Sequence, residues 1–285
     1  MKFYIYIFIL NSLFISEIKG QSGTMDAYFE SMFSASYMNT VKVLSSLKNT
    51  SPNDIKTRLA FANYYLVMFE TTGELEKYNI LCNKEDGYVN TVLSKKKDLS
   101  PDDVFDMISS KAILLKIQFR QKKIIKAVNG LRTIIKYFEY ATEHEEHIKM
   151  KLVSGMYNYY IENAKDDYPA AYPILLFFPD GDKAKGLRML KECTKEKDKT
   201  VQIRSHLYLA NIYRRDEKNF EQSEYWFQQL TAKYPSNVFW LSDYILMLRE
   251  YEKHKKAEIQ KNKLLKILQE SDQLTEEQIQ YLKTI

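Results

Sequence analysis

One short stretch of this sequence gathers side chains that could hold a metal ion, Glu143-His144-Glu145-Glu146-His147. His144 and His147 are three residues apart, so on a helix they would share a face and could ligate a metal together with a carboxylate. Their order differs from the His-Glu-x-x-His pattern of zincins and from its inverted form. The stretch is strongly polar and lies at a junction between expected helices. We interpret it as a solvated helix start and keep a helical metal-dependent enzyme as an alternative.

Other motifs of catalysis and cofactor binding are missing from the sequence. It has no glycine-rich phosphate loop, no Gly-x-Ser-x-Gly elbow and no Cys-x-x-Cys pair. Asp180-Gly181-Asp182 offers too few oxygen ligands for a calcium loop and is typical of a turn. We therefore assign no catalytic residue, no cofactor and no metal site, and we expect a protein that is not an enzyme.

Composition favours a helical globular protein. The 285 residues are enough for one large domain or two smaller ones, and they include only eight glycines and six prolines. So few turn formers argue against a sheet-and-turn protein and against disorder. The net charge of +5 is modest and the charges are interspersed, so nucleic-acid binding is not implied.

The N-terminus has the form of a secretory signal. Met1-Lys2 precedes the apolar run FYIYIFILNSLFIS, which is shorter than the roughly 20 residues of a membrane span. Polar residues and the small Gly20 follow, so residues 1–20 are predicted to be a signal peptide, with an uncleaved anchor as the alternative. The protein is then exported, to the periplasm or cell envelope or beyond. Cys82 and Cys193 could there form one disulfide or remain two buried thiols.

Apolar residues recur with helical spacing along most of the chain after Gly23. A weaker helix over 74–97 is expected to break near Gly87. Clear periodic segments are expected at about 25–47, 101–121, 123–142 and 145–163. Consecutive amphipathic helices with short links predict an all-α, antiparallel helical-hairpin array, because stacked pairs bury jointly what one pair cannot bury alone.

Residues 200–237 predict the clearest helical hairpin in the chain. Small Ala210 and Ser223 stand where the two helices must approach closely, and Pro235 ends the second helix. The expected inward residues of the two helices are Ile203, Leu207, Ala210 and Tyr213, then Phe220, Ser223, Phe227 and Leu230.

This hairpin resembles a tetratricopeptide repeat (TPR). The run 209–213, Leu-Ala-Asn-Ile-Tyr, matches the Leu-small-x-x-Tyr core of the family's first helix. Ser223, Phe227, Leu230 and Pro235 match the second helix and its closing proline, in a unit about one residue longer than the usual 34. His206 replaces the usual Trp, and Leu230 the preferred Ala. The resemblance implies a TPR-like α-solenoid.

The resemblance widens to residues 150–240. The run 155–160, Gly-Met-Tyr-Asn-Tyr-Tyr, a proline-rich aromatic crossover and the Gly181-Asp182 turn are similar to a class of TPR-like proteins exported to bacterial envelopes, whose function is unassigned. The chain is accordingly divided into the signal at 1–20, an N-terminal helical region at 24–142, and a TPR-like region with C-terminal capping helices at 143–285.

The family's pattern implies a non-catalytic scaffold that binds a protein or peptide on a concave helical face. Arginines with an asparagine suit a carboxylate or an acidic peptide. The partner-binding residues implied by the pattern are Tyr159, Tyr160, Arg204, Asn211, Arg214 and Arg215.

Residues 165–181 interrupt the helical pattern with three prolines and a run of five apolar residues. We expect a buried crossover between helical pairs, because such a run would form a sticky patch if exposed. The alternative is peripheral membrane contact through residues 172–178, which would make the protein a structural component of an envelope assembly.

Overall fold

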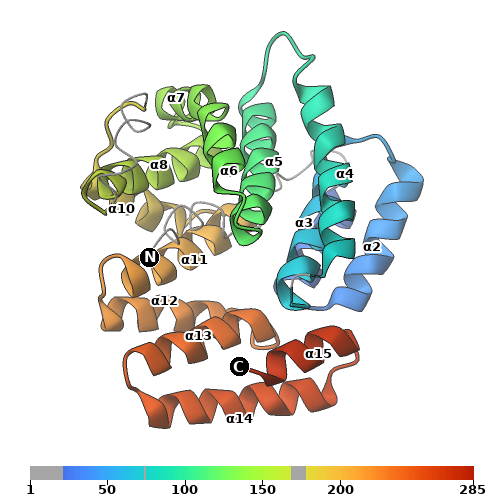
Figure 1. The fold of residues 1–285 in the computed structure, drawn as a ribbon, viewed down its shortest axis with the longest axis vertical. Coiled ribbons are helices and arrows are strands. Elements are labelled where there is room, and N and C mark those ends of the chain that lie inside the picture. Colours follow the sequence, from blue (N-terminus) through green and yellow to red (C-terminus); the bar gives the residue numbers. More distant parts are fainter. Residues whose placement is uncertain (1–21, 74, 168–177) are drawn as a thin grey trace. The chain divides into compact units, whose positions relative to one another are not determined.

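The computed structural model describes residues 22–73, 75–167 and 178–285 (Figure 1). Within these ranges the protein is all-α, with helix at 78% and no strand, and consecutive helices pack as adjacent pairs. The predicted all-α class of paired helices is therefore confirmed.

The described helices follow one another with mostly short links. In chain order they are α1 (Ser22–Phe33), α2 (Tyr37–Thr50), α3 (Ile55–Thr71), α4 (Glu76–Leu93), α5 (Pro101–Arg120), α6 (Ile124–Arg132), α7 (Ile135–Glu143), α8 (Ile148–Asp167), α10 (Lys183–Cys193), α11 (Lys199–Arg215), α12 (Phe220–Lys233), α13 (Val238–Glu250), α14 (His254–Glu270) and α15 (Glu276–Lys283).

Packing divides these helices into two compact units. Unit 1 holds described residues 86–167 and 178–209, and unit 2 holds 22–85, without residue 74, and 210–285. The boundaries fall inside α4 and α11, so each of these helices contributes to both units. The sequence predicts that a TPR-like region begins at residue 143. The two packing units do not test that boundary, so it stays a prediction.

In unit 1, α8 and α10 lie against each other with their backbones almost in contact (Figure 1). A Cβ atom on Gly186 would stand 2.6 Å from the carbonyl oxygen of Gly155 and 2.6 Å from the backbone nitrogen of Tyr159. No side chain fits there. The buried side chains of Met189 and Leu190 lie beside Gly155 at this contact, and α5 packs against α6, α7 and α8.

Unit 2 joins two parts of the chain that are distant in sequence. Asn237 accepts a hydrogen bond from the backbone of Trp240, which caps α13, and its amide donates to the carbonyl of Phe33 at 2.8 Å. At a second point, Gln278 of α15 donates to Thr71 of α3 at 2.9 Å. The spacing Thr-x-x-Gln at 275–278 predicts a capping box, and Gln278 completes it with Thr275.

Four hairpins in the described residues turn in the same way. Each has a left-handed, non-glycine residue, with φ between 50° and 58°, and the next helix begins two residues later. In three of them the following N–H donates to the carbonyl five residues back, whereas the α11/α12 turn is one residue longer and its bond runs from Asn219 to Tyr213. The left-handed residues are Ala35, Lys122, Lys218 and Glu252.

The α11/α12 pair confirms the predicted hairpin over 200–237. The hydroxyl of Ser223 donates to the carbonyl of Ala210 at 2.9 Å, so these small residues mark the helix crossing as expected. The inward residues predicted for both helices are buried, except Phe220, which is half-buried.

Three predicted helix boundaries are wrong. The segment 25–47 is two helices, because Ala35 adopts the left-handed conformation and the hydroxyl of Ser34 bonds the carbonyl of Glu30 at 2.6 Å. The segment 123–142 breaks between α6 and α7, where Thr133 bonds the carbonyl of Gly130 at 2.8 Å.

The helix α4, in contrast, runs unbroken through Gly87. Nothing lies within 4 Å of a Cβ atom at that position, so this glycine serves no close contact and the helix simply tolerates it.

Several predictions fall partly or wholly outside the described residues. The predicted signal at 1–20 lies outside them, as do residues 168–177 of the crossover, although Phe178 at its described end is buried. No helix in the described part is long and apolar enough to cross a membrane. Cys82 and Cys193 are both buried and form no disulfide.

Replacing Gly186 with alanine should destabilise the protein by about 2 to 3 kcal/mol, because the new methyl group would press on backbone atoms that cannot turn aside. Chemical denaturation monitored by circular dichroism measures the loss. Gly87→Ala is the matched control: it should leave stability unchanged or raise it by up to about 1 kcal/mol. Equal effects of both variants would contradict the proposed packing of α8 on α10.

Candidate functional site

The two tyrosines expected to face a partner lie instead in the interior of unit 1. Tyr159 and Tyr160 are buried on α8, with ring centroids 5.1 Å apart in an edge-to-face arrangement. The ammonium of Lys183, at the start of α10, stands 5.6 Å from the centre of the Tyr159 ring. These contacts give Tyr159 a packing role at the α8/α10 contact.

The polar residues predicted on α11 are also mostly buried. Arg204 is 1% exposed, and its guanidinium stands 5.4 Å over the ring of Phe105 on α5. Asn211 is buried, and Arg215 is exposed. The structure therefore does not bring the six predicted residues together on one open face, and their partner-binding role stays a prediction.

Arg214 has a defined structural partner within unit 2. Its Nε and Nη2 atoms donate to the two carboxylate oxygens of Glu250 at 2.7 and 2.5 Å, a bidentate pair between α11 and the end of α13. The carbonyl of Arg214 accepts a hydrogen bond from Tyr251 at 2.9 Å. The side chain of Arg214 is 3% exposed and that of Glu250 is about half exposed, so the ion pair lies at the edge of the contact between α11 and α13.

Arg214 and Arg215 give a matched test of these placements. Arg214→Met should cost about 1 to 3 kcal/mol of stability, because it leaves the Glu250 carboxylate without its bidentate partner. Arg215→Met should change stability by less than about 0.5 kcal/mol, because that side chain is exposed. Urea denaturation measures the free energy of unfolding of both variants. An Arg214→Met variant as stable as the parent would contradict the structural role of Arg214.

The histidine-rich stretch does not assemble a metal site in the described structure. His144 stacks on Tyr140, with ring centroids 3.9 Å apart, and its Nδ1 atom is 2.8 Å from the Tyr140 carbonyl oxygen. Glu145 turns toward α8 and α10, where it accepts hydrogen bonds from Ser154 and Lys185. Among the described residues, no three His, Cys, Asp or Glu side chains are grouped to hold a metal ion.

Glu145 instead belongs to a polar network that holds the start of α10. Its carboxylate is 2.7 Å from the ammonium of Lys185 and 2.6 Å from the hydroxyl of Ser154. Asn158 donates to Ser154 and accepts from the backbone of Asp182, the residue that caps α10. Together with the glycine contact, this network fixes how α10 lies on α8.

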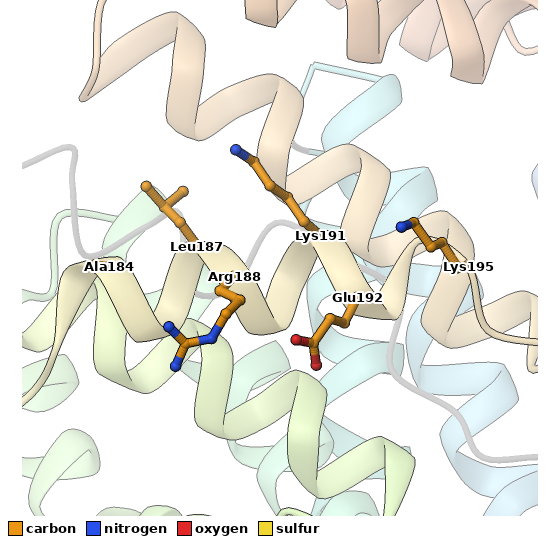
Figure 2. Close-up of a pocket in the computed structure, with 6 residues that line it drawn as sticks. All are labelled: Ala184, Leu187, Arg188, Lys191, Glu192 and Lys195. Carbon is orange, nitrogen blue, oxygen red and sulfur yellow. The ribbon is translucent and has the colours of Figure 1, made fainter.

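The face of α10 that this packing presents contains a shallow depression of about 480 Å³ (Figure 2). In Figure 2, Leu187 and Lys191 project to one side of the helix, and Arg188 and Glu192 project to the other. The first five lining residues are spaced by three, four, seven and eight from the first, which is the pattern of one helix face, and the last, Lys195, lies in the turn after α10. The lining residues are Ala184, Leu187, Arg188, Lys191, Glu192 and Lys195, and we call them the α10 stripe.

The α10 stripe is electropositive. Its carboxylate, Glu192, pairs with Lys151 of α8 at 2.7 Å, a hydrogen bond that lowers the pKa of Glu192 and raises that of Lys151. Within the described residues, the side chains of Arg188 and Lys195 form neither an ion pair nor a hydrogen bond. Leu187, half-buried, supplies an apolar spot among these cations.

The chain matches no protein-family model, no curated protein and no solved structure. The site must therefore be interpreted from its own chemistry. Sequence reasoning missed the α10 stripe, although Leu187, Arg188, Lys191 and Lys195 recur at helical spacing. That signal alone does not say which face of the helix stays open, since Leu190 on the same helix is fully buried.

A buried carboxyl group lies elsewhere in unit 1. Asp86 of α4 accepts hydrogen bonds from the hydroxyl of Ser110 on α5 and from the amide of Asn90 at 3.0 Å. Burial raises the pKa of Asp86 to about 7, although these hydrogen bonds and the charge of Lys111 oppose the rise. The group joins α4 to α5 and titrates near neutral pH.

Asp86 should make the protein less stable as the pH rises. Its pKa is higher in the folded state, at about 7, than in the unfolded chain, at about 4. The folded protein therefore holds a proton between those values that the unfolded chain has lost, and stability falls by roughly 1 kcal/mol per pH unit across that window.

Asp86→Asn removes this titration, so it should stabilise the protein relative to the parent by about 1 to 3 kcal/mol above pH 7, with the advantage shrinking toward about pH 4. Urea denaturation over the pH range measures the difference. Asp103→Asn is the contrasting control. Partial burial would raise the pKa of Asp103, but hydrogen bonds from Lys96 and Ser100 lower it below that of the unfolded chain. The parent therefore gains stability as the pH rises through the pKa, and Asp103→Asn should be less stable than the parent above it. A pH-independent gap between parent and Asp86→Asn would contradict the assignment.

Proposed function

We propose that the protein is a TPR-like helical scaffold, without catalytic activity, that binds a protein or peptide partner through the surface of its helices. The observation that carries the proposal is the recurrence of one turn in unit 2. Glu252 follows Lys218 by 34 residues, and each residue is left-handed at the turn of a helical hairpin. Thirty-four residues is the length of a tetratricopeptide repeat.

The packing inside the first of these hairpins supports the same proposal. TPR helices cross at small residues, and the α11/α12 crossing lies at Ala210 and Ser223, joined by a hydrogen bond of 2.9 Å. The α13/α14 hairpin follows directly, and α13 also packs on α12. A short α15 with a capping box and exposed Glu276 and Glu277 then ends the series, as a polar terminal helix should.

The proposal places the partner on surface that the fold leaves open. Of the six residues expected to bind a partner, five are buried and Arg215 is exposed. A partner could contact the five buried side chains only if the helices that cover them separated. An open helix face, with exposed cations around an apolar residue, requires no such change and suits a partner that carries carboxylates.

We also propose that the protein is exported and acts in the cell envelope or outside the cell, on the strength of the signal-like residues 1–20. N-terminal sequencing of the protein from the producing cells tests this part. A mature chain that begins near residue 21 supports export, whereas a chain that retains Met1 in the cytoplasmic fraction contradicts it.

Crosslinking in the producing cells tests the scaffold proposal. The tagged full chain should recover at least one protein in a fixed ratio, and a tagged, unrelated exported helical protein of similar charge should not. Arg215→Glu reports whether the exposed residue of the predicted set takes part. Recovery of no protein above the unrelated control would count against a scaffold, whichever surface is involved.

A further inference from the structure

The α10 stripe has the dimensions of a contact between two helices. Its helical residues run from Ala184 to Glu192, which spans about 12 Å along the helix axis at 1.5 Å per residue, and Lys195 follows in the turn after the helix. Positions separated by three, four, seven and eight residues are those by which one helix contacts another laid along it. The stripe is therefore long enough for about two turns of a partner helix.

The charges of the stripe select the chemistry of such a partner. Arg188 and Lys195 contribute two positive charges that form no ion pair within the described residues, and the negative charge of Glu192 is already engaged by Lys151. Leu187 offers an apolar spot at one end of the row of cations (Figure 2). A partner helix with an apolar residue at one end of a face and carboxylates along the rest of that face would complement this pattern.

Contacts with α8 and a helix cap also fix the position of α10 and therefore of the stripe. Gly186, between the stripe positions, lies in backbone contact with α8, and Asp182 caps the helix through the backbone of Lys185 at 2.7 Å. The network from Glu145 holds the ammonium of Lys185. These contacts fix the backbone of α10 and therefore the positions from which the Arg188 and Lys195 side chains extend, so the backbone has little conformational entropy left to lose on binding.

We propose that the α10 stripe docks an acidic amphipathic helix of a partner protein, with its carboxylates beside Arg188 and Lys195 and an apolar side chain against Leu187. This rests on the proposed scaffold function and names the chemistry of its ligand. A contact of about two turns is small, so binding is weak and falls with added salt.

The first test measures binding of a synthetic probe to the full chain by fluorescence anisotropy. The probe is a labelled 14-residue helical peptide with a leucine at one end of one face and glutamates along the rest of that face. Arg188→Glu/Lys195→Glu should weaken binding by about tenfold or more. Lys255→Glu/Lys263→Glu on α14 changes the net charge equally at exposed lysines outside the stripe and should leave affinity within about twofold. Circular dichroism checks that each variant folds.

Three results would overturn the proposal. One is equal binding by the two double variants, and another is equal binding of a shuffled peptide of the same composition, since both would show unspecific charge attraction. The third is an absence of saturable peptide binding. If phosphatidylglycerol vesicles then bind the parent and not the α10 variant, the stripe is a membrane surface instead. If self-association of the parent is lost in that variant, the occupant is a second copy of the chain.

Crosslinking in cells separates failure of this proposal from failure of the scaffold function. A partner recovered equally with the parent and with Arg188→Glu/Lys195→Glu leaves the scaffold standing and removes the stripe as its docking site. A partner lost only with that variant, while Lys255→Glu/Lys263→Glu retains it, supports the stripe. If the parent recovers no partner, the scaffold proposal fails. The peptide measurement alone then tests whether the α10 stripe binds an acidic helix.

Discussion

Where α8 meets α10, two helix backbones approach so closely that a methyl group on Gly186 would overlap the carbonyl oxygen of Gly155. This approach determines how α10 is rotated about its axis. Its buried side carries Leu190 and Met189, and its other side carries the α10 stripe. The surface chemistry of the stripe thus follows from a contact that involves none of its own side chains.

Charged side chains in this protein often serve to hold helices rather than to meet ligands. Glu145 engages Lys185, Arg214 engages Glu250, and the guanidinium of Arg204 lies over an aromatic ring. Burying a charge is unfavourable unless it is paired, so each such group constrains which helices can be neighbours. The same residues look like candidates for recognition when only their type and spacing are considered, because the sequence does not show which charges already have partners.

The limits of prediction from this sequence are visible at individual positions. Helix starts with a polar cap and helix interiors with regular apolar spacing were predictable, as at Thr275 and along 200–237. Two breaks were not predicted. At the first, Ala35 takes the left-handed conformation although no glycine stands there to indicate it, and at the second, α6 ends at Arg132 inside an apolar pattern that continues into α7. At Gly87 the sequence predicts a break, but α4 continues through it. A helix that packs on its neighbours through buried side chains can accommodate a glycine at a cost of about 1 kcal/mol.

The sequence by itself determined that the described chain is helical and that its helices pair, because periodic apolar side chains have to be buried against a neighbouring helix. It also located the α11/α12 crossing, since only small residues allow helices so close. The tertiary structure decided which polar residues are left for binding. Arg188 and Arg214 cannot be told apart by type, yet one lies on an open helix face and the other pairs with Glu250, 36 residues away. Long-range pairing of this kind depends on how helices stack, which local spacing does not encode.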